Sequence, residues 1–253
     1  MRCFVEAANL PRDCGMLLYG EKYAGKLRNP LERLGVESVL VPNNPNIDPC
    51  LTGHADLSVL HLGGEVLLLA PYLKGSAAAE ELRNCGAELI FPEIEQREAY
   101  PGDAQFNLCV VGKHVLYNKY TVPNCVVDLL TSRREAALRP CRQGYTRCAS
   151  CIVNDHALIT ADRGVCAAAE AAGLDVLLIS PGHIELDGFP YGFLGGASFK
   201  LAKDVLAFTG TLDKHPDRSR ILHYLRERQV EPVYLTSEPI FDIGSAIPLM
   251  EKN

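Results

Sequence analysis

Hydrophobic residues recur along the chain in short runs that follow stretches of helical periodicity, and glycine or proline marks most of the boundaries. Val-, Ile- and Leu-rich runs of this length are typical of buried strands, and a glycine after a helix supplies the left-handed backbone that ends it. The pattern therefore predicts a helix followed by a strand at four places. The four runs are "VESVLVP" after Gly35, "AELIFP" after Gly86, "LDVLLISP" after Gly173 and "QVEPVYLTS" from Gln229.

The helical stretches before these runs span residues 23–35, 76–86, 163–173 and 216–229. Ser76, Asp162 and Asp217 are predicted N-caps, because their side-chain oxygens can accept a hydrogen bond from a free N–H group of the first turn. A fifth helical stretch, 124–138, starts at Asn124, and no clear strand follows it. The alternation of helices and strands predicts an α/β fold.

A second set of apolar runs begins at small polar residues, each of which follows a polar loop. These five residues lie 49, 43, 48 and 47 positions apart, and they are Ser58, Asn107, Ser150, Ser198 and Ser245. Self-similarity at a period of about 47 residues indicates a repeat architecture in which one unit cannot bury its own apolar face. Each unit is predicted to contain strand, strand, helix and strand, and the alternative is the ordinary alternation of any α/β protein.

The two ends of the chain are incomplete as repeat units. The last apolar segment, "SAIPLM", has no helix after it, and the first, "RCFVEA", has no partner strand before it. In a closed ring, the C-terminal strand would complete the N-terminal unit and remove exposed sheet edges. We therefore expect a single domain, residues 1–253, in which five ββαβ units form a five-fold pseudosymmetric α/β propeller closed by the C-terminal strand.

Composition narrows the functional classes. The 253 residues are 47% hydrophobic and carry a formal charge of −6 with no run of Lys or Arg, which argues against a nucleic-acid partner. No apolar stretch approaches the roughly 20 residues of a membrane span, and the N-terminus lacks the apolar core of a secretory signal. The ten cysteines lie mostly in apolar segments, so free thiols and a cytoplasmic location are expected, with the oligomeric state left open.

The repeat and one of its loops carry a family resemblance. Five ββαβ units of this length, together with the segment "GHIELDGFPYGFLGGASF" from Gly182, resemble the pentein fold of the guanidino-group-modifying enzymes, in a bacterial branch of that superfamily. The superfamily includes arginine deiminases, agmatine deiminases, dimethylarginine hydrolases and amidinotransferases, and also a non-catalytic ribosome anti-association factor. The resemblance implies a small cationic, guanidino-type ligand in a central axial cleft, with no cofactor and no metal.

If the units surround an axis, the loops between them gather at one end of it. Gly182 to Gly196 is then a loop across this opening, where glycines let the backbone approach a ligand and polar side chains point inward. Carboxylates in such a cleft favour a planar cation through paired hydrogen bonds, and the alternative is that these loop acids are simply solvated. The predicted ligand-binding residues are His54, Asp56, Asp103, Gln105, Arg147, Glu185, Asp187 and Asp242.

The resemblance also implies a reaction, in which a cysteine thiolate attacks the guanidinium carbon, a histidine protonates the departing amine and carboxylates hold the nitrogens. In the family this cysteine belongs to the last loop, which in this chain is "SEPIFDIGS" and contains none. Cys148 is the predicted replacement, since Arg147 beside it would lower its pKa. His183 in "HIELD" is the predicted acid/base, and His54 in "GHAD" is the alternative.

Other kinds of site have less support. Cys148 and Cys151 form a lone CxxC, which is weak support for zinc without a second pair and lacks the helix start of a redox dithiol. "GFLGG" is not GxGxxG and precedes a strand-like run, which disfavours nucleotide binding. The cysteine-free last loop keeps two classes open: a deiminase-, amidinohydrolase- or amidinotransferase-like enzyme acting on C–N bonds, or a binding or interaction protein that retains the fold without the nucleophile.

Overall fold

The computed structural model describes residues 3–133 and 135–252. Arg2, in the first apolar segment, and Arg134, in the fifth helical stretch, therefore lie outside the described residues, as do Met1 and Asn253. None of the helices in the described ranges combines the length and the apolar character needed to span a membrane.

Strand, strand, helix and strand follow one another four times along the chain, as the repeat predicts. The elements are β4 (Val59–Gly63), β5 (Val66–Leu69), α2 (Ala77–Asn84) and β6 (Glu88–Ile90); β7 (Cys109–Val111), β8 (His114–Tyr117), α3 (Asn124–Arg133) and β9 (Ala137–Pro140); β10 (Cys151–Asn154), β11 (Ala157–Thr160), α4 (Arg163–Ala171) and β12 (Asp175–Leu178); and β13 (Ser198–Ala202), β14 (Val205–Phe208), α5 (Arg218–Glu227) and β15 (Glu231–Tyr234). Each unit forms its own three-stranded sheet.

The fifth sheet joins the two ends of the chain. Its members are β1 (Cys3–Phe4), β2 (Cys14–Gly20), α1 (Ala24–Arg33), β3 (Glu37–Val41) and the C-terminal β16 (Ile247–Glu251). Strand β16 lies between β1 and β2 and runs antiparallel to both, and β2 pairs in parallel with β3 across α1. The C-terminal strand thus completes the N-terminal unit, as predicted. Three short 3₁₀ helices complete the elements: η1 (Glu21–Tyr23), η2 (Ala55–Leu57) and η3 (Pro71–Leu73).

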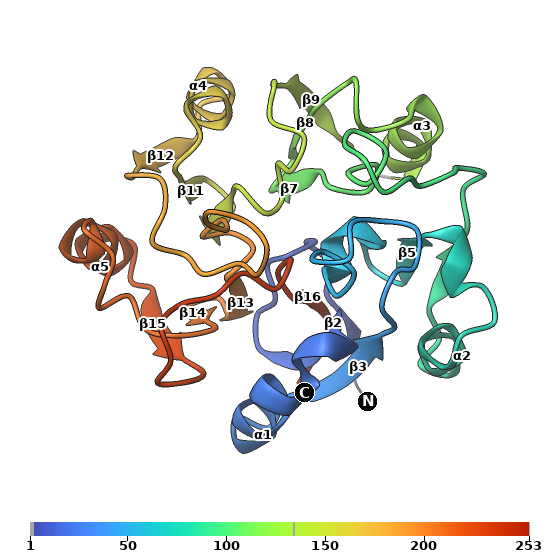
Figure 1. Ribbon diagram of the computed structural model, residues 1–253, viewed down its shortest axis with the longest axis horizontal. Coiled ribbons are helices and arrows are strands. Elements are labelled where there is room, and N and C mark those ends of the chain that lie inside the picture. Colours follow the sequence, from blue (N-terminus) through green and yellow to red (C-terminus); the bar gives the residue numbers. More distant parts are fainter. Residues whose placement is uncertain (1–2, 134, 253) are drawn as a thin grey trace.

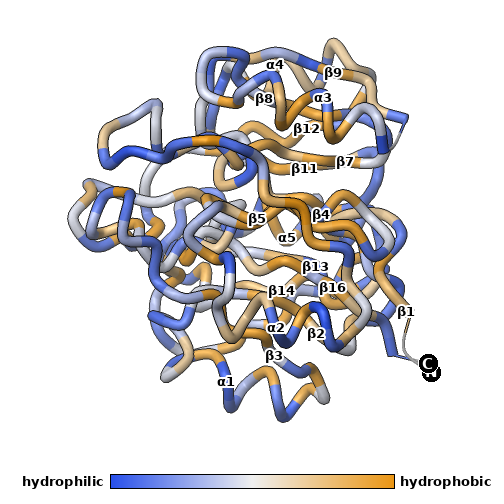
Figure 2. Tube along the Cα trace, turned by 90° about the vertical axis from the view of Figure 1, so that its right-hand side faces the viewer, coloured by the Kyte–Doolittle hydropathy of each residue, from blue (hydrophilic) through white to orange (hydrophobic). Residues whose placement is uncertain are grey.

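The result is a mixed α/β fold with five small sheets. Figure 1 shows the sheets around a common centre, with the five α-helices on the outside. Figure 2 shows hydrophobic residues concentrated along the strands and hydrophilic residues mostly in the surrounding loops and turns. Each helix buries an apolar stripe of residues four apart against a sheet, which stabilises it in the fold. Examples are Leu27 and Leu31, Val165 and Ala169, and Ile221 and Leu225.

The helix starts confirm two of the three predicted N-caps. The side chain of Ser76 accepts a hydrogen bond from the backbone N–H of Ala79, and that of Asp162 accepts one from Val165. Asp217 occupies the N-cap position of α5 but makes no capping hydrogen bond. Its carboxylate instead accepts from the backbone N–H of Ser180 and from Arg220, so a tertiary contact replaces the expected local one.

The unit formed by β7, β8, α3 and β9 differs from the prediction at its last strand. The stretch 124–138 was expected to be helical with no clear strand after it, but α3 ends at Arg133 and β9 begins at Ala137. Strand β9 pairs in parallel with β8 and is only partly buried. Its sequence, "ALRP", lacks the run of β-branched residues that marks a buried strand, so the pairing with β8 decides its conformation.

The five recurring polar residues lie deep in the protein. Ser58, Asn107, Ser150, Ser198 and Ser245 are each at most 1% exposed, and each lies within two residues of the start of a strand, namely β4, β7, β10, β13 and β16 in turn. The hydroxyl of Ser245 donates to the backbone oxygen of Ser198, 3.0 Å away. The repeat in the sequence therefore marks interior positions at which neighbouring units meet.

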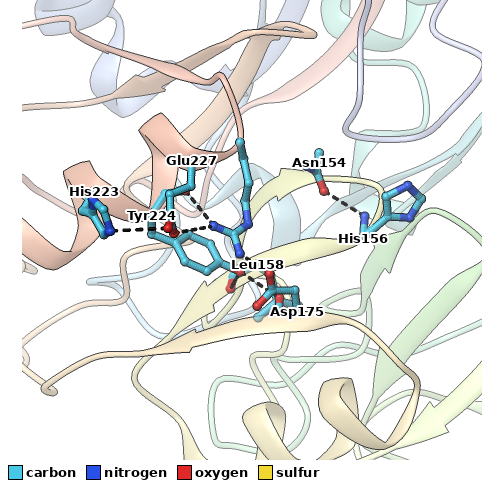
Figure 3. Close-up of polar contacts among 8 residues, drawn as sticks. Asn154, His156, Leu158, Asp175, His223, Tyr224 and Glu227 are labelled. Atoms are coloured by element: carbon cyan, nitrogen blue, oxygen red, sulfur yellow. Dashed lines mark hydrogen bonds and ion pairs between the residues drawn. The ribbon is translucent and has the colours of Figure 1, made fainter.

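Helix α5 also connects two units. The Tyr224 hydroxyl donates to the backbone oxygens of Asp175 and Leu158, at 2.9 and 3.3 Å, in the sheet of the preceding unit (Figure 3). The guanidinium of Arg228 lies 3.4 Å from the centre of the Tyr224 ring and pairs with the Asp175 carboxylate. These contacts hold the unit that contains α5 against the preceding unit.

Candidate functional site

The loops that connect successive units meet at one cavity. They span residues 42–58, 91–108, 141–150, 179–197 and 235–246, and each runs from the last strand of one unit to the first strand of the next. A cavity of about 380 Å³ receives at least one side chain from every one of them, as the sequence analysis expects. Its lining residues are Leu51, His54, Tyr100, Gln143, Tyr145, Cys148, Leu186, Phe189, Tyr191, Phe193 and Asp242.

A thiol and a carboxyl group meet at the floor of this cavity. The thiol of Cys148 donates a hydrogen bond to Asp56 Oδ2, 2.9 Å away, and accepts one from Asn107 Nδ2 at 3.4 Å. Asn107 Oδ1 also accepts from the backbone N–H groups of Arg147 and Cys148. Cys148 lines the cavity, whereas Asp56 lies behind it. Asn107 therefore orients the thiol toward both the cavity and the carboxyl group.

His54 stands beside this pair. Its side chain is 3% exposed, its Nε2 has no hydrogen-bond partner, and burial lowers its pKa to about 3, so the ring is neutral at neutral pH. One ligand atom each from His54, Asp56 and Cys148 lies within 4.8 Å of the other two. Imidazole, thiolate and carboxylate are all zinc ligands, so these three residues could hold a metal ion as well as perform thiol chemistry.

Asp242, from the last loop, supplies a second carboxyl group. Its Oδ1 accepts from the backbone N–H of Gly244 at 2.9 Å, and its Oδ2 accepts from that of Phe193 at 2.8 Å. Burial raises the pKa of Asp242 to about 6. A side chain at Gly196 would overlap Asp242 Oδ1, so a glycine is needed there for the carboxyl group to reach the cavity.

Electrostatics keep the thiol protonated in the unliganded site. Burial and the neighbouring Asp56 and Asp242 raise the pKa of Cys148 well above its ordinary value. Burial likewise raises the pKa of Asp56 to about 7, although its hydrogen bond with Cys148 and the charge of Arg147 act against this. Both carboxyl pKa values are raised chiefly by burial, so a cation bound in the cavity would favour the charged forms of these groups.

The prediction that Arg147 lowers the pKa of the Cys148 thiol is wrong. Its guanidinium donates to the backbone oxygens of Ser150 and Gly195 and to the Ser245 hydroxyl, at 3.2, 3.3 and 2.5 Å, and it does not line the cavity. The pKa of Cys148 is raised rather than lowered, because burial and two carboxylates dominate. Arg147 instead joins three loops in the interior.

The polar side chains predicted in the segment from His183 to Asp187 do not line the cavity, although Leu186 of the same segment does. His183, Glu185 and Asp187 are exposed, and none of them lines the cavity. The ring of His183 packs edge-on against that of His215, with 5.7 Å between their centres. The roles predicted for these three residues remain predictions, and the geometry brings His54 rather than His183 to Cys148.

Asp103 reaches the wall of the cavity only indirectly, and Gln105 does not line it. Asp103 is 2% exposed, and its Oδ2 accepts a hydrogen bond of 2.5 Å from the hydroxyl of Tyr145, which itself lines the cavity. Gln105 donates to the backbone oxygen of Glu95. Of the eight predicted ligand-binding residues, the cavity is lined by His54 and Asp242.

Sequence reasoning missed the aromatic wall of the site. Five aromatic side chains line the cavity, from three different loops: Tyr100, Tyr145, Phe189, Tyr191 and Phe193. Three of them belong to "GFPYGF", whose aromatic residues stand out in the sequence beside the glycines. The signal was present, but only the histidine and acids of this loop were assigned to the ligand.

Comparisons with known proteins agree on the fold. The DUF6873 family, described as a family of unknown function, matches residues 19–247, and no curated protein matches the sequence. Inosamine-phosphate amidinotransferase from Streptomyces griseus superposes with a TM-score of 0.61 and 12% identity over 98% of this chain and 97% of its own. Agmatine deiminase from C. jejuni gives 0.56 and 9% over 90% and 89%, and DDAH from Pseudomonas aeruginosa 0.53 and 10% over 92% and 96%. The fold resemblance predicted from the sequence is confirmed.

Proposed function

Because this chain belongs to the DUF6873 family and has the pentein fold, we propose that it binds a guanidinium-type cation in the cavity above Cys148 and acts on one of its C–N bonds. Solved proteins of this fold are named amidinotransferases and deiminases. The five sheets form a five-fold pseudosymmetric propeller in this proposal, and the whole chain acts as one domain. The repeated ββαβ order and the convergence of all five loops on one cavity support this arrangement.

The observation that carries the proposal is the Cys148–Asp56 pair at the floor of the cavity, with unused hydrogen-bonding atoms around it. Within the described part of the chain, Asp56 Oδ1 and His54 Nε2 are buried and have no hydrogen-bond partner, and buried polar atoms are normally paired. Atoms of this kind mark a place where a ligand completes the hydrogen bonding. A planar cation with several N–H donors fits acceptors and carboxylates better than a neutral or anionic ligand does.

Asp242 and His54 hold the cation in this proposal. Both oxygens of Asp242 are already fixed by backbone N–H groups, and each retains a lone pair for an N–H of the ligand. The neutral ring of His54 accepts or donates one hydrogen bond beside them. A cation bound at Asp242 lowers the pKa values of both buried carboxyl groups and of the Cys148 thiol, so binding itself activates the nucleophile.

The proposed reaction begins when Cys148 Sγ passes its proton to Asp56 Oδ2 and forms a bond to the guanidinium carbon. A pKa of about 7 suits Asp56 to take up a proton near neutral pH. The C–N bond to the departing amine then breaks, and the amine takes this proton by way of His54. Water attacks the sulfur-bound carbon, the S–C bond breaks, and the sulfur regains a proton. If ammonia is the group that departs, the products are an alkylurea and ammonia. If the substituted amine departs, water gives urea and that amine, and an acceptor amine in place of water gives amidino transfer.

A second candidate function is binding without chemistry. The observation that favours it is the raised pKa of Cys148, together with a last loop that presents Asp242 where the family's nucleophile is expected. Under this alternative the cavity binds the same class of cation and no bond is broken. Product formation distinguishes the two, because only the catalytic protein releases an amine.

Binding of the cation should depend on Asp242. We expect Asp242→Asn to weaken the binding of agmatine or butylguanidine about 10- to 100-fold, because a charge-assisted hydrogen bond is lost from a buried position. Isothermal titration calorimetry measures this directly. Asp128→Asn is the matched control, since Asp128 is an exposed acid on helix α3 that does not line the cavity. Equal losses in the two variants would contradict this placement of the ligand.

A further inference from the structure

The wall of the cavity differs in chemistry from its floor. The polar atoms at the floor come from His54, Cys148 and Asp242, whereas the rest of the lining is mostly aromatic or aliphatic. Apart from the hydroxyl groups of the tyrosines, Gln143 is the remaining polar residue of the lining, and both ends of its amide are used: it donates to Asp162 and accepts from the backbone N–H of Tyr145. The part of a ligand that extends away from the floor therefore meets apolar surface.

Among the described residues, no lysine or arginine lines this cavity. Two nearby cationic side chains make hydrogen bonds to other groups. Arg147 makes the interior contacts described above, and Lys22 donates to the backbone oxygen of Cys50 on the exposed side of the loop 42–58. Arg142, Arg163 and Arg220 line an adjoining cavity of about 850 Å³, which shares Tyr100, Gln143 and Tyr191 with the first cavity. A carboxylate on a ligand that fills the first cavity would lose its water without gaining a cationic partner, and it would face Asp242.

The aromatic side chains are placed to accept a ring or an alkyl group. The hydroxyl of Tyr145 is occupied by Asp103, and the Tyr145 ring lies 5.7 Å from that of Tyr100 at a tilt of 44°. Phe189 and Tyr191 are 39% and 46% exposed, which is unusual for large hydrophobic side chains in this protein. A ligand with an apolar body buries their exposed faces, and aromatic pairs prefer such tilted arrangements.

We propose that the cavity selects guanidinium compounds whose substituent is uncharged and apolar, preferably aromatic, over those that carry a carboxylate. This inference rests on the proposed function, because it assigns the guanidinium end to Asp242 and His54. A substituent of phenylethyl size suits a cavity of about 380 Å³, at the small end of the range for ligand pockets. The substrate class is thus an alkyl- or arylalkyl-guanidine rather than a free guanidino acid.

Three ligands that differ only in their tails test this inference by calorimetry: 2-phenylethylguanidine, butylguanidine and 4-guanidinobutanoate. We expect 2-phenylethylguanidine to bind about 10-fold more tightly than butylguanidine, and 4-guanidinobutanoate at least about 10-fold more weakly than butylguanidine. Binding of 4-guanidinobutanoate as tight as that of butylguanidine overturns the inference and leaves the proposed function standing. If none of the three binds, both are overturned.

Substitutions at Phe189 and Tyr191, two exposed aromatic residues of the cavity lining, test the contribution of the ligand's substituent separately from that of its guanidinium group. Phe189→Leu combined with Tyr191→Leu should reduce the preference for 2-phenylethylguanidine over butylguanidine to about 3-fold or less. Tyr120→Leu is the control, because Tyr120 is 79% exposed and does not line the cavity. An unchanged preference in the double variant shows that the tail binds elsewhere and overturns the inference.

Discussion

Cys148→Ala is expected to abolish release of an amine from a guanidinium substrate, with a loss of at least about 10³-fold in kcat/KM. The reason is that the structure places the sulfur of Cys148 at the floor of the cavity, 2.9 Å from a carboxyl oxygen that can take its proton. Binding should be affected far less, since the cation is held by Asp242 and His54 in our proposal. The measurement is a steady-state assay of amine and ureido product across a set of alkylguanidines.

Cys151→Ala is the matched control for this experiment. Cys151 is also buried, lies three residues away and starts β10, but it does not line the cavity. We expect this variant to retain wild-type turnover. Full activity in Cys148→Ala removes the thiol from the mechanism, and wild-type protein that binds guanidinium compounds without releasing an amine supports the binding alternative.

Asp56→Asn is expected to make the protein more stable at pH 8 and less active. Burial raises the pKa of Asp56 to about 7, far above the value of about 4 in an unfolded chain. The folded protein therefore holds a proton that the unfolded chain has lost, so the stability contributed by Asp56 is present below pH 4 and is lost as the pH rises to about 7. Asparagine does not titrate and avoids this loss.

The expected gain is about 2 to 4 kcal/mol at pH 8, or on the order of 5–10 °C in Tm, with no gain at pH 4. Asparagine can still accept the hydrogen bond from Cys148, but it cannot take up the proton, so kcat should fall about 100-fold. Thermal unfolding at both pH values measures the first effect. A variant that is destabilised equally at pH 4 and pH 8 would show that the carboxylate is not under electrostatic strain.

Much of the fold could be predicted from the sequence, because the same pattern of strands and helix recurs along the chain. The five polar residues at a period of about 47 all proved buried, and the C-terminal strand joined the first sheet as its missing member. Strand β9 was the exception. Its partly exposed sequence carries no strand signal of its own, and only pairing with β8, a tertiary contact, makes it extended.

The site was predicted less completely, since a loop sequence does not tell which way its side chains face. The loops do converge, as predicted, and their convergence brings together four of the predicted residues: Cys148, Asp56, His54 and Asp242. The resemblance to a family motif favours His183 over His54 as the acid/base residue, yet the ring of His183 packs against that of His215. Spacing within one loop could not reveal this, because it depends on contacts with another unit.

The charge balance around the thiol could not be deduced from sequence neighbours either. Arg147 precedes Cys148 in the chain, but its side chain turns into the interior, while two acids from distant loops approach the sulfur. Asn107, which orients the thiol, was identified as a repeat position and not as a functional one. Both errors arise because the site is assembled from five loops, each of which supplies between one and four side chains.

The most direct test of the central claim, a cation site over Cys148, compares alkylation of individual cysteines by chloroacetamidine, which carries an amidinium, and by the neutral chloroacetamide. Peptide mass spectrometry gives both rates at Cys148 and at the exposed Cys125, which serves as the internal reference. We predict that the ratio of the amidinium rate to the neutral rate is at least about 10-fold higher at Cys148 than at Cys125. Equal ratios at the two cysteines, or a Cys148 that resists both reagents while Cys125 reacts, would contradict the account.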